Sequence, residues 1–203
     1  MRAKLVFVAM CLLLTGSACT AALAEESLDE KAVGKPYFTV GFELDLLPYL
    51  TGGWYGSVYG GYNGWRVRGV VSSFNMPKFV TPDGFEDWEV NAAYALIVDR
   101  FFGKQSWDFR GFWAGTGFEY WNNQVRPENV SASTRFDSWY FTLGGGYAWK
   151  LVENLYLMPW GAVHLRVAGD DDIDVSGETF QPPFFSAEVS LKIGYHFGVR
   201  ERK

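Results

Sequence analysis

Residues 185–197 read FSAEVSLKIGYHF, and this stretch decides the fold class. Apolar side chains occupy every second position. The positions between them carry Ser186, Glu188, Ser190, Lys192, Gly194 and His196. A period of two is that of a β-strand with one apolar and one polar face, whereas an amphipathic helix repeats every three to four residues. The segment is therefore predicted to be a strand.

The same alternation recurs along the chain. The predicted strands are Tyr37–Leu46, Trp54–Tyr62, Trp65–Phe74, Trp88–Asp99, Trp107–Trp121, Ser138–Lys150, Leu155–Val167 and Phe185–Phe197. The second is rich in Gly and Tyr, and its phase is not readable. The fifth changes phase, so we expect a β-bulge near Gly111. Asn63-Gly64 is a strong hairpin signal. Eight strands of this kind predict an all-β, antiparallel up-and-down barrel.

The connections alternate in length. The second, fourth and sixth are short (Asn63-Gly64, Arg100–Ser106 and Val152–Asn154), and the third, fifth and seventh are longer (75–84, 122–134 and 169–183). The first, 47–53, is intermediate. Because strands alternate in direction, all short turns lie at one end of the barrel, and both chain ends lie at that end too.

Charge indicates which face of the strands lies inside. One face carries Glu43, Asp45, Arg66, Arg68, Glu89, Asp99, Arg166, Glu188 and Lys192. The other face is nearly uncharged, and Trp and Tyr gather at its ends. Aromatic residues form 18% of the chain, more than a soluble domain hides easily. A secreted soluble barrel or sandwich is the alternative, but it would need the charged face outside. The pattern favours a transmembrane barrel with a polar lumen.

The first residues are typical of an export signal. Arg2 and Lys4 precede an apolar run, Leu5–Leu14, and Ala22-Leu23-Ala24 provides a cleavage pattern. We expect a signal peptide at 1–24, a flexible polar lead at 25–35, the barrel at 36–197 and a C-terminal extension at 198–203. Lipoprotein processing at Cys19 is a weaker alternative, because the preceding residues lack a bulky aliphatic side chain.

The alternation, the loop asymmetry and the final aromatics, Tyr195 and Phe197, resemble the small outer-membrane β-barrels of Gram-negative bacteria. That class includes the membrane domain of outer-membrane protein A and its OmpX-like, loop-only relatives. The resemblance implies a place in the cell outer membrane, with both termini periplasmic and with outer-membrane lipids and lipopolysaccharide as partners. It also implies that the barrel-assembly machinery recognises Ala187–Phe197. The chain departs from the class in continuing past the final aromatic.

An eight-stranded lumen is just wide enough for side chains, so inward charges must pair. We expect six inward residues to form a cluster near the outer end of the lumen. Arg66 and Arg68 should lie nearer the periplasmic end, and Lys192 should also point inward. The cluster is Glu43, Asp45, Glu89, His164, Arg166 and Glu188. The first interpretation is a structural plug of salt bridges. The alternatives are a path for small solutes or protons, and an acid–base site that uses His164 beside Glu188.

The segment after the seventh strand is acidic. Asp170, Asp171, Asp172 and Asp174 are a possible site for a divalent cation shared with lipopolysaccharide, although the spacing matches no calcium-loop motif and a solvated loop is the alternative. No cofactor is predicted.

Three functional classes remain: a structural, envelope or surface-interaction barrel, a narrow porin-like channel, and a lipid-A-modifying enzyme. The enzyme is the least favoured. Lipid A deacylases would need a Ser two residues after His164, where Arg166 stands, and no predicted loop carries the His of a palmitoyl-transferring barrel. A net charge of −5 argues against nucleic-acid binding. The oligomeric state is not readable, because a lipid-facing apolar surface looks like an interface.

Overall fold

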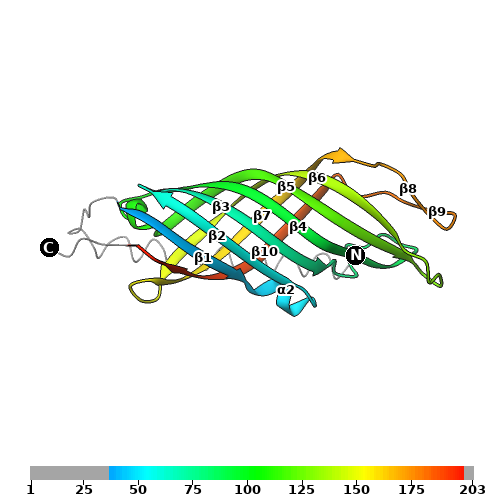
Figure 1. The fold of residues 1–203 in the computed structure, drawn as a ribbon, viewed down its shortest axis with the longest axis horizontal. Helices are drawn as coiled ribbons and strands as arrows, with labels where there is room; N and C mark the ends of the chain where they lie inside the picture. The colour runs from blue at the N-terminus through cyan, green and yellow to red at the C-terminus, as the bar shows by residue number, and fades with distance from the viewer. Residues whose placement is uncertain (1–36, 199–203) are drawn as a thin grey trace.

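The computed structural model describes residues 37–198, and within them the chain forms a closed antiparallel barrel (Figure 1). Its eight wall strands are β1 (Phe38–Asp45), β2 (Trp54–Tyr62), β3 (Trp65–Asn75), β4 (Phe85–Phe101), β5 (Gly111–Pro127), β6 (Thr134–Lys150), β7 (Leu155–Gly169) and β10 (Phe185–His196). Neighbours in sequence pair with each other, and β1 closes the ring by pairing with β10. The predicted fold class is confirmed. The predicted segments 1–24 and 25–35 lie outside the described residues.

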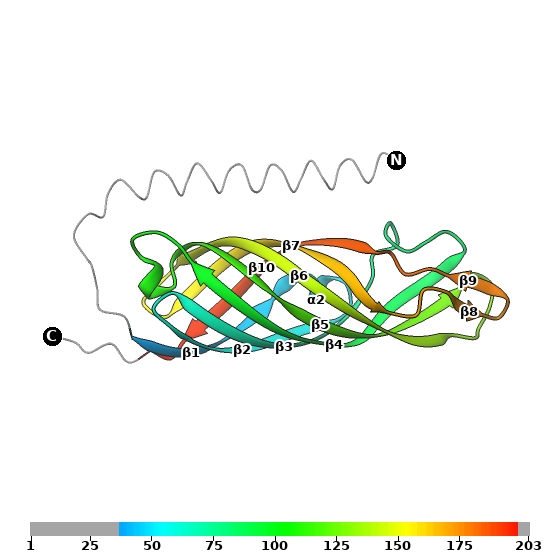
Figure 2. The ribbon, with the colours of Figure 1, turned by 90° about the horizontal axis from the view of Figure 1, so that it is seen from above.

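The short turns lie at one end of the barrel, where β1 begins and β10 ends (Figure 2). The predicted hairpin at Asn63-Gly64 is a tight turn with φ of 49° and 75°, the left-handed values of a type I′ turn. Figure 2 also shows the longer connections after β3, β5 and β7 at the opposite end. We call the two ends the turn end and the loop end.

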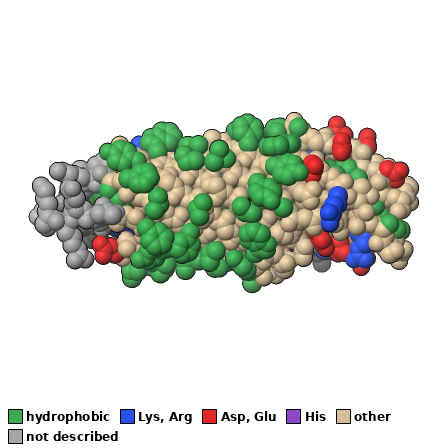
Figure 3. Space-filling model, in the orientation of Figure 1, with side chains coloured by type: hydrophobic (Ala, Val, Ile, Leu, Met, Phe, Trp, Pro, Cys, Tyr) green, Lys and Arg blue, Asp and Glu red, His purple; other side chains and the backbone are tan. Residues whose placement is uncertain are grey.

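The outer surface of the barrel is an apolar belt between two rings of aromatic side chains. Toward the turn end the ring contains Phe38, Tyr62, Trp65, Phe112 and Phe197, and toward the loop end it contains Tyr49, Trp54, Tyr94, Trp139 and Phe185. The exposed aliphatic residues Val58, Leu96 and Leu143 lie between the rings. Figure 3 shows the apolar side chains over the barrel and the charged ones gathered at the loop end.

In strand β2 the structure shows which residues face the lumen, although the sequence pattern does not indicate it. Tyr55, Ser57 and Tyr59 point inward and are buried, whereas Trp54 and Tyr62 are exposed. Tyrosine occurs on both faces because its ring suits the belt and its hydroxyl suits the polar lumen. Composition alone therefore does not assign the faces.

The predicted phase of the fourth strand is wrong in its outer part. The pairing of β4 with β5 shifts between Val90 and Ala92, which is the position of a bulge. Tyr94 is exposed, but Trp88 and Val90, which have the same parity in the sequence, are buried. Glu89 alternates with them and therefore lies on the outer face, not in the lumen. The extra residue of the bulge reverses which face each later side chain occupies.

The predicted bulge near Gly111 is also wrong, because β5 begins at that residue. Ser106–Asp108 forms a short 3-10 helix, and Phe109 follows with a left-handed φ of 55° and a buried ring. Trp107 and Phe109 therefore precede the strand. The phase change in the sequence marks the entry to the strand and not an irregularity inside it.

Two segments predicted to be loops contain additional strands. β5 continues to Pro127, and its ladder with β6 extends into residues 122–134 as far as the pair of Val125 and Thr134. A hairpin of β8 (Ile173–Val175) and β9 (Glu178–Phe180) forms inside 169–183. Its apolar side chains pack on the extended strands. This outer core consists of Phe85, Trp88, Val125, Phe136, Ile173, Val175 and Phe180. Its residues are far apart in sequence, so the local polar composition concealed it.

The first connection contains a short helix, α2 (Leu46–Leu50). The carboxylate of Asp45 caps it by accepting a hydrogen bond from the Leu47 amide at 3.2 Å. β1 consequently ends at Asp45, which makes it shorter than β4, β5, β6 or β7. Within residues 37–198, none of the helices is long and apolar enough to cross a membrane.

Candidate functional site

The middle of the lumen is filled by a network of two arginines and two carboxylates. Arg66 donates to Glu43 at 2.5 Å and to Asp99 at 2.8 Å. Arg68 donates to Asp99 at 2.8 and 3.1 Å and approaches Glu43 at 3.5 Å. All four side chains are at most 3% exposed. Each charge therefore has opposite partners in place of the water it has lost.

Lys192 extends the network toward the loop end. Its Nζ lies 3.6 Å from the ring centroid of Trp160 and has no hydrogen-bond partner within the described residues. A cation over an indole face is stabilised by the ring quadrupole. The Trp160 indole in turn donates to Asp45 at 2.8 Å, and Ser190 donates to the same carboxylate.

The central charges balance. Three cations, Arg66, Arg68 and Lys192, face three anions, Glu43, Asp45 and Asp99, and all are buried. The remaining space is filled by an aromatic cluster that includes Tyr59, Phe101, Phe109, Trp113, Tyr156 and Trp160. We call these charged and aromatic residues together the plug. A water-filled passage would leave its side chains solvent-exposed, and they have almost no exposed surface.

The turn end of the lumen is closed as well. Lys150 donates to both oxygens of Asp108 at 2.7 Å, and the Tyr37 hydroxyl donates to Asp108 at 2.7 Å. Behind them, the ring of His196 lies 2.6 Å from the Tyr59 hydroxyl. The polar groups here pair across the lumen and hold its walls together.

The structure does not bring the predicted outer cluster together. Glu43 and Asp45 belong to the plug, with the two arginines that were expected nearer the other end. The predicted position of Glu43 and Asp45, near the outer end of the lumen, is wrong because β1 is short. The last residues of β1 therefore lie in the middle of the barrel. Long arginine side chains from β3 then reach them. Glu89 lies outside the lumen.

Above the plug the lumen opens into a cavity of about 870 Å³, which we call the outer cavity. Its floor contains Tyr55, Arg68, Trp113 and Trp160, and its walls include Phe74, Met76, Trp88, Ile97 and Trp121. Residues 75–83 of the connection after β3 also line it. No sequence pattern indicates this space, because an ideal eight-stranded barrel is filled by side chains.

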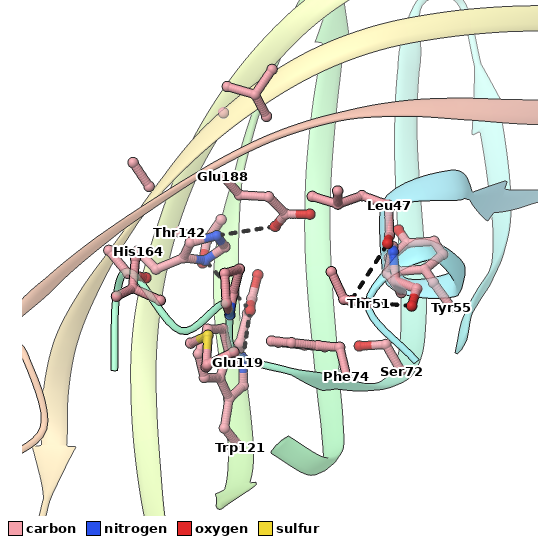
Figure 4. A pocket seen from close by; sticks show the side chains of 18 of the residues that line it. Leu47, Thr51, Tyr55, Ser72, Phe74, Glu119, Trp121, Thr142, His164 and Glu188 are labelled. Carbon is pink, nitrogen blue, oxygen red and sulfur yellow. Dashed lines mark hydrogen bonds and ion pairs between the residues drawn. The ribbon is translucent and has the colours of Figure 1, made fainter. Parts of the chain in front are cut away.

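His164 on β7 stands in the wall of the outer cavity with carboxylates at both ring nitrogens (Figure 4). Nε2 lies 3.3 Å from Glu188, and Nδ1 lies 3.6 Å from Glu119 and 2.9 Å from the Thr142 hydroxyl. The predicted pair of His164 and Glu188 is therefore adjacent. Glu119 was absent from the predicted cluster, although its inward parity in the fifth strand was readable.

Thr142, His164 and Glu188 form a hydroxyl–imidazole–carboxylate series, the order found in nucleophilic catalysis. Two features oppose that chemistry. Thr142 is only 4% exposed, and the Glu119 carboxylate lies beside the same Nδ1, where it would repel a developing alkoxide. The geometry suits an ion pair that fixes β5, β7 and β10 relative to one another.

Arg166 and the acidic segment form separate local contacts at the loop end. Arg166 pairs with Asp171 and donates to the Asp170 carbonyl at 2.9 Å. Asp172 accepts from Gln181, and Asp174 accepts from the Gly177 amide in the β8–β9 turn. The four aspartates do not converge, and no group within residues 37–198 has the arrangement of a metal site.

The chain matches no known family model, and no curated protein matches its sequence. Among solved structures, it is similar to the N-terminal β-barrel domain of OprF from Pseudomonas aeruginosa, with 12% identity and a TM-score of 0.52 over 80% of this chain and all of that one. A major outer membrane protein of Thermus thermophilus matches with 15% identity and a TM-score of 0.47 over 81% and 100%. Neisserial surface protein A matches with 10% identity and a TM-score of 0.46 over 78% and 96%. The OprF likeness shows the fold.

Proposed function

We propose that this chain is an outer-membrane β-barrel protein of a Gram-negative envelope, with a structural or surface-interaction role and a lumen closed by side chains. One observation carries this proposal: the apolar belt between two aromatic rings surrounds a lumen that holds the buried charges. In water this arrangement would expose a continuous apolar surface, which soluble proteins avoid. In a bilayer it matches the lipid outside, and the strand ladders, which close into a ring where β1 pairs with β10, satisfy most of the backbone of the wall.

We assign the orientation from the unequal lengths of the connections at the two ends. The turn end faces the periplasm, and the loop end, with its charged residues and the β8–β9 hairpin, faces the exterior. Along the belt the partners are outer-membrane lipids, including lipopolysaccharide in the outer leaflet. The barrel-assembly machinery recognises the alternating strand Ala187–Phe197. The plug disfavours the channel alternative, because solutes would have to displace paired charges.

Fractionation of a Gram-negative host that expresses the full chain tests this proposal. We expect the protein in the outer membrane, resistant to carbonate extraction and migrating faster on SDS gels when it is not heated. Single cysteines give the orientation: Asp172→Cys should react with an impermeant maleimide in intact cells, and Lys104→Cys only after permeabilisation. A soluble protein without heat-dependent mobility contradicts the proposal.

A further inference from the structure

The barrel wall is incomplete on one side of β10. That strand pairs with β7 from Phe185 to Tyr195, but its described pairing with β1 covers only Lys192–His196. Within residues 37–198, the stretch 185–191 therefore has no strand partner on the β1 side. An antiparallel strand directs half of its backbone hydrogen-bonding groups to each neighbour. At this break those groups face α2 instead of a strand.

The outer cavity reaches this break. Its lining includes Leu47, Pro48 and Thr51 from the α2 region and Ala187, Glu188 and Val189 from β10. Figure 4 shows Glu188 and Leu47 facing each other from β10 and α2. The exposed apolar residues around the break are Leu46, Tyr49, Leu50, Phe184 and Phe185. The break thus lies within the apolar belt, near its loop-end ring.

The cavity has the size and chemistry of a small-molecule site. Its volume, about 870 Å³, lies within the range of ligand pockets, and apolar and aromatic side chains dominate its lining. Arg68 on the floor is paired within the plug, and Lys78 and Asp83 belong to the connection after β3. The other charged side chains of the lining are on one wall, where Glu119 and Glu188 flank His164. Two carboxylates against one imidazole leave this wall negative whether the ring is neutral or protonated. Glu188, with a side chain 29% exposed, is the most open of the three.

We propose that the outer cavity binds a small, largely apolar molecule that carries a hydroxyl or amino group, and that this molecule enters from the lipid between α2 and β10. The apolar body contacts the aromatic walls, and the donor group bonds to Glu188. A carboxylate head is disfavoured by the negative wall. Entry through the break separates no strand ladder, because within residues 37–198 this side of β10 faces α2 and not a strand. The route rests on the proposed membrane location, whereas the binding site does not.

Binding is measured on the full chain in amphipol with 1-aminoanthracene, an apolar amine that accepts energy from the tryptophans of the cavity. We expect saturable binding. Ala95→Trp, which fills the cavity from β4, should weaken it about tenfold or more. Leu96→Trp, the next residue and lipid-facing, is the matched control and should bind like the native chain. Non-saturable signal, or equal affinity in both variants, overturns the site.

The preference for a donor group is measured with anthracene-9-carboxylate. This probe should bind about tenfold more weakly than the amine. Glu188→Gln should reduce this difference in affinity between the two probes. Because Gln preserves the size of the side chain, the variant tests charge and not packing. Equal binding of the two probes to the native chain overturns the assigned ligand class.

The route is measured by transfer of 1-aminoanthracene from preloaded vesicles that contain the protein. Leu46→Trp, on α2 at the edge of the break and outside the lining of the outer cavity, should slow loading without changing the affinity at equilibrium. The control is Val163→Trp, because Val163 pairs with Ala187 across the intact β7–β10 ladder. Equal rates in the two variants overturn the lateral route. Heat-dependent gel mobility of the same samples shows whether they inserted, so failure of the route is distinct from failure of the membrane location.

Discussion

Arg68 donates two hydrogen bonds to Asp99, from Nε at 2.8 Å and from Nη2 at 3.1 Å, in the middle of the lumen. Such a bidentate pair is geometrically specific and strong when its other lone pairs are satisfied. Here Arg66 supplies the further donor to Asp99. The pair joins β3 to β4 through the lumen, in addition to their backbone ladder.

Asp99→Ala should destabilise the barrel by about 3–5 kcal/mol, because it leaves two buried guanidiniums with one carboxylate between them. Asp87→Ala is the control, since Asp87 pairs with Arg126 on the exposed loop end, where an ion pair contributes about 0–1 kcal/mol. Urea unfolding in lipid vesicles, followed by gel mobility, gives both values. Equal losses would show that the central network does not support the fold.

The native chain in planar bilayers should show no stepwise conductance, since the plug leaves no solvent-exposed passage. Arg166→Ala should also be silent. Its side chain contacts Asp171 at the loop end and takes no part in the plug. Discrete conductance steps from the native protein would mean that the plug opens.

Phe180→Ala should loosen the β8–β9 hairpin, because its ring packs 5.0 Å from Phe85 and 5.4 Å from Trp88 between centroids. Removal of a buried Phe costs about 3–5 kcal/mol, here concentrated in the outer core. Hydrogen exchange of residues 173–180 should rise while that of the belt strands does not change. Thr179→Ala, at an exposed neighbour, serves as the control. Faster exchange throughout the barrel would contradict an independent outer core.

Lipid A from cells with and without the protein should be identical by mass spectrometry. His164 is held between two carboxylates, and the hydroxyl next to it is buried. Thr142→Ala should therefore affect stability and not lipid composition. Acyl-chain changes that depend on Thr142 would assign an enzymatic role to this series.

The sequence predicted the barrel because each strand encodes its faces locally. Phe38, Val40 and Phe42 are exposed, whereas Thr39 and Glu43, at alternate positions of the same strand, are buried, as their alternation indicated. The same reasoning failed where a backbone irregularity changes the phase. Trp88 and Val90 have the parity of the exposed Tyr94, yet the bulge before Ala92 turns them inward. No residue type there marks the extra position.

The candidate site was less predictable than the wall. Parity placed His164, Glu188 and Glu119 inside, and the structure brings them together. The contact of Glu43 with Arg66 depends on how far a long side chain reaches across a tilted sheet, which parity does not contain. The outer cavity depends on where β1 ends, and that is decided by the capping of α2 by Asp45.

A spin-label scan of residues 69–72 on β3 in lipid vesicles tests the central claim most directly. Gly69 and Val71 lie on the belt face, and Val70 and Ser72 line the outer cavity, so a label fits at each position. If the barrel lies in the membrane, oxygen, which concentrates in lipid, should enhance the relaxation of labels at 69 and 71. A water-soluble nickel complex should enhance the relaxation of labels at 70 and 72. Uniform accessibility, or the opposite alternation, would contradict a lipid-embedded barrel.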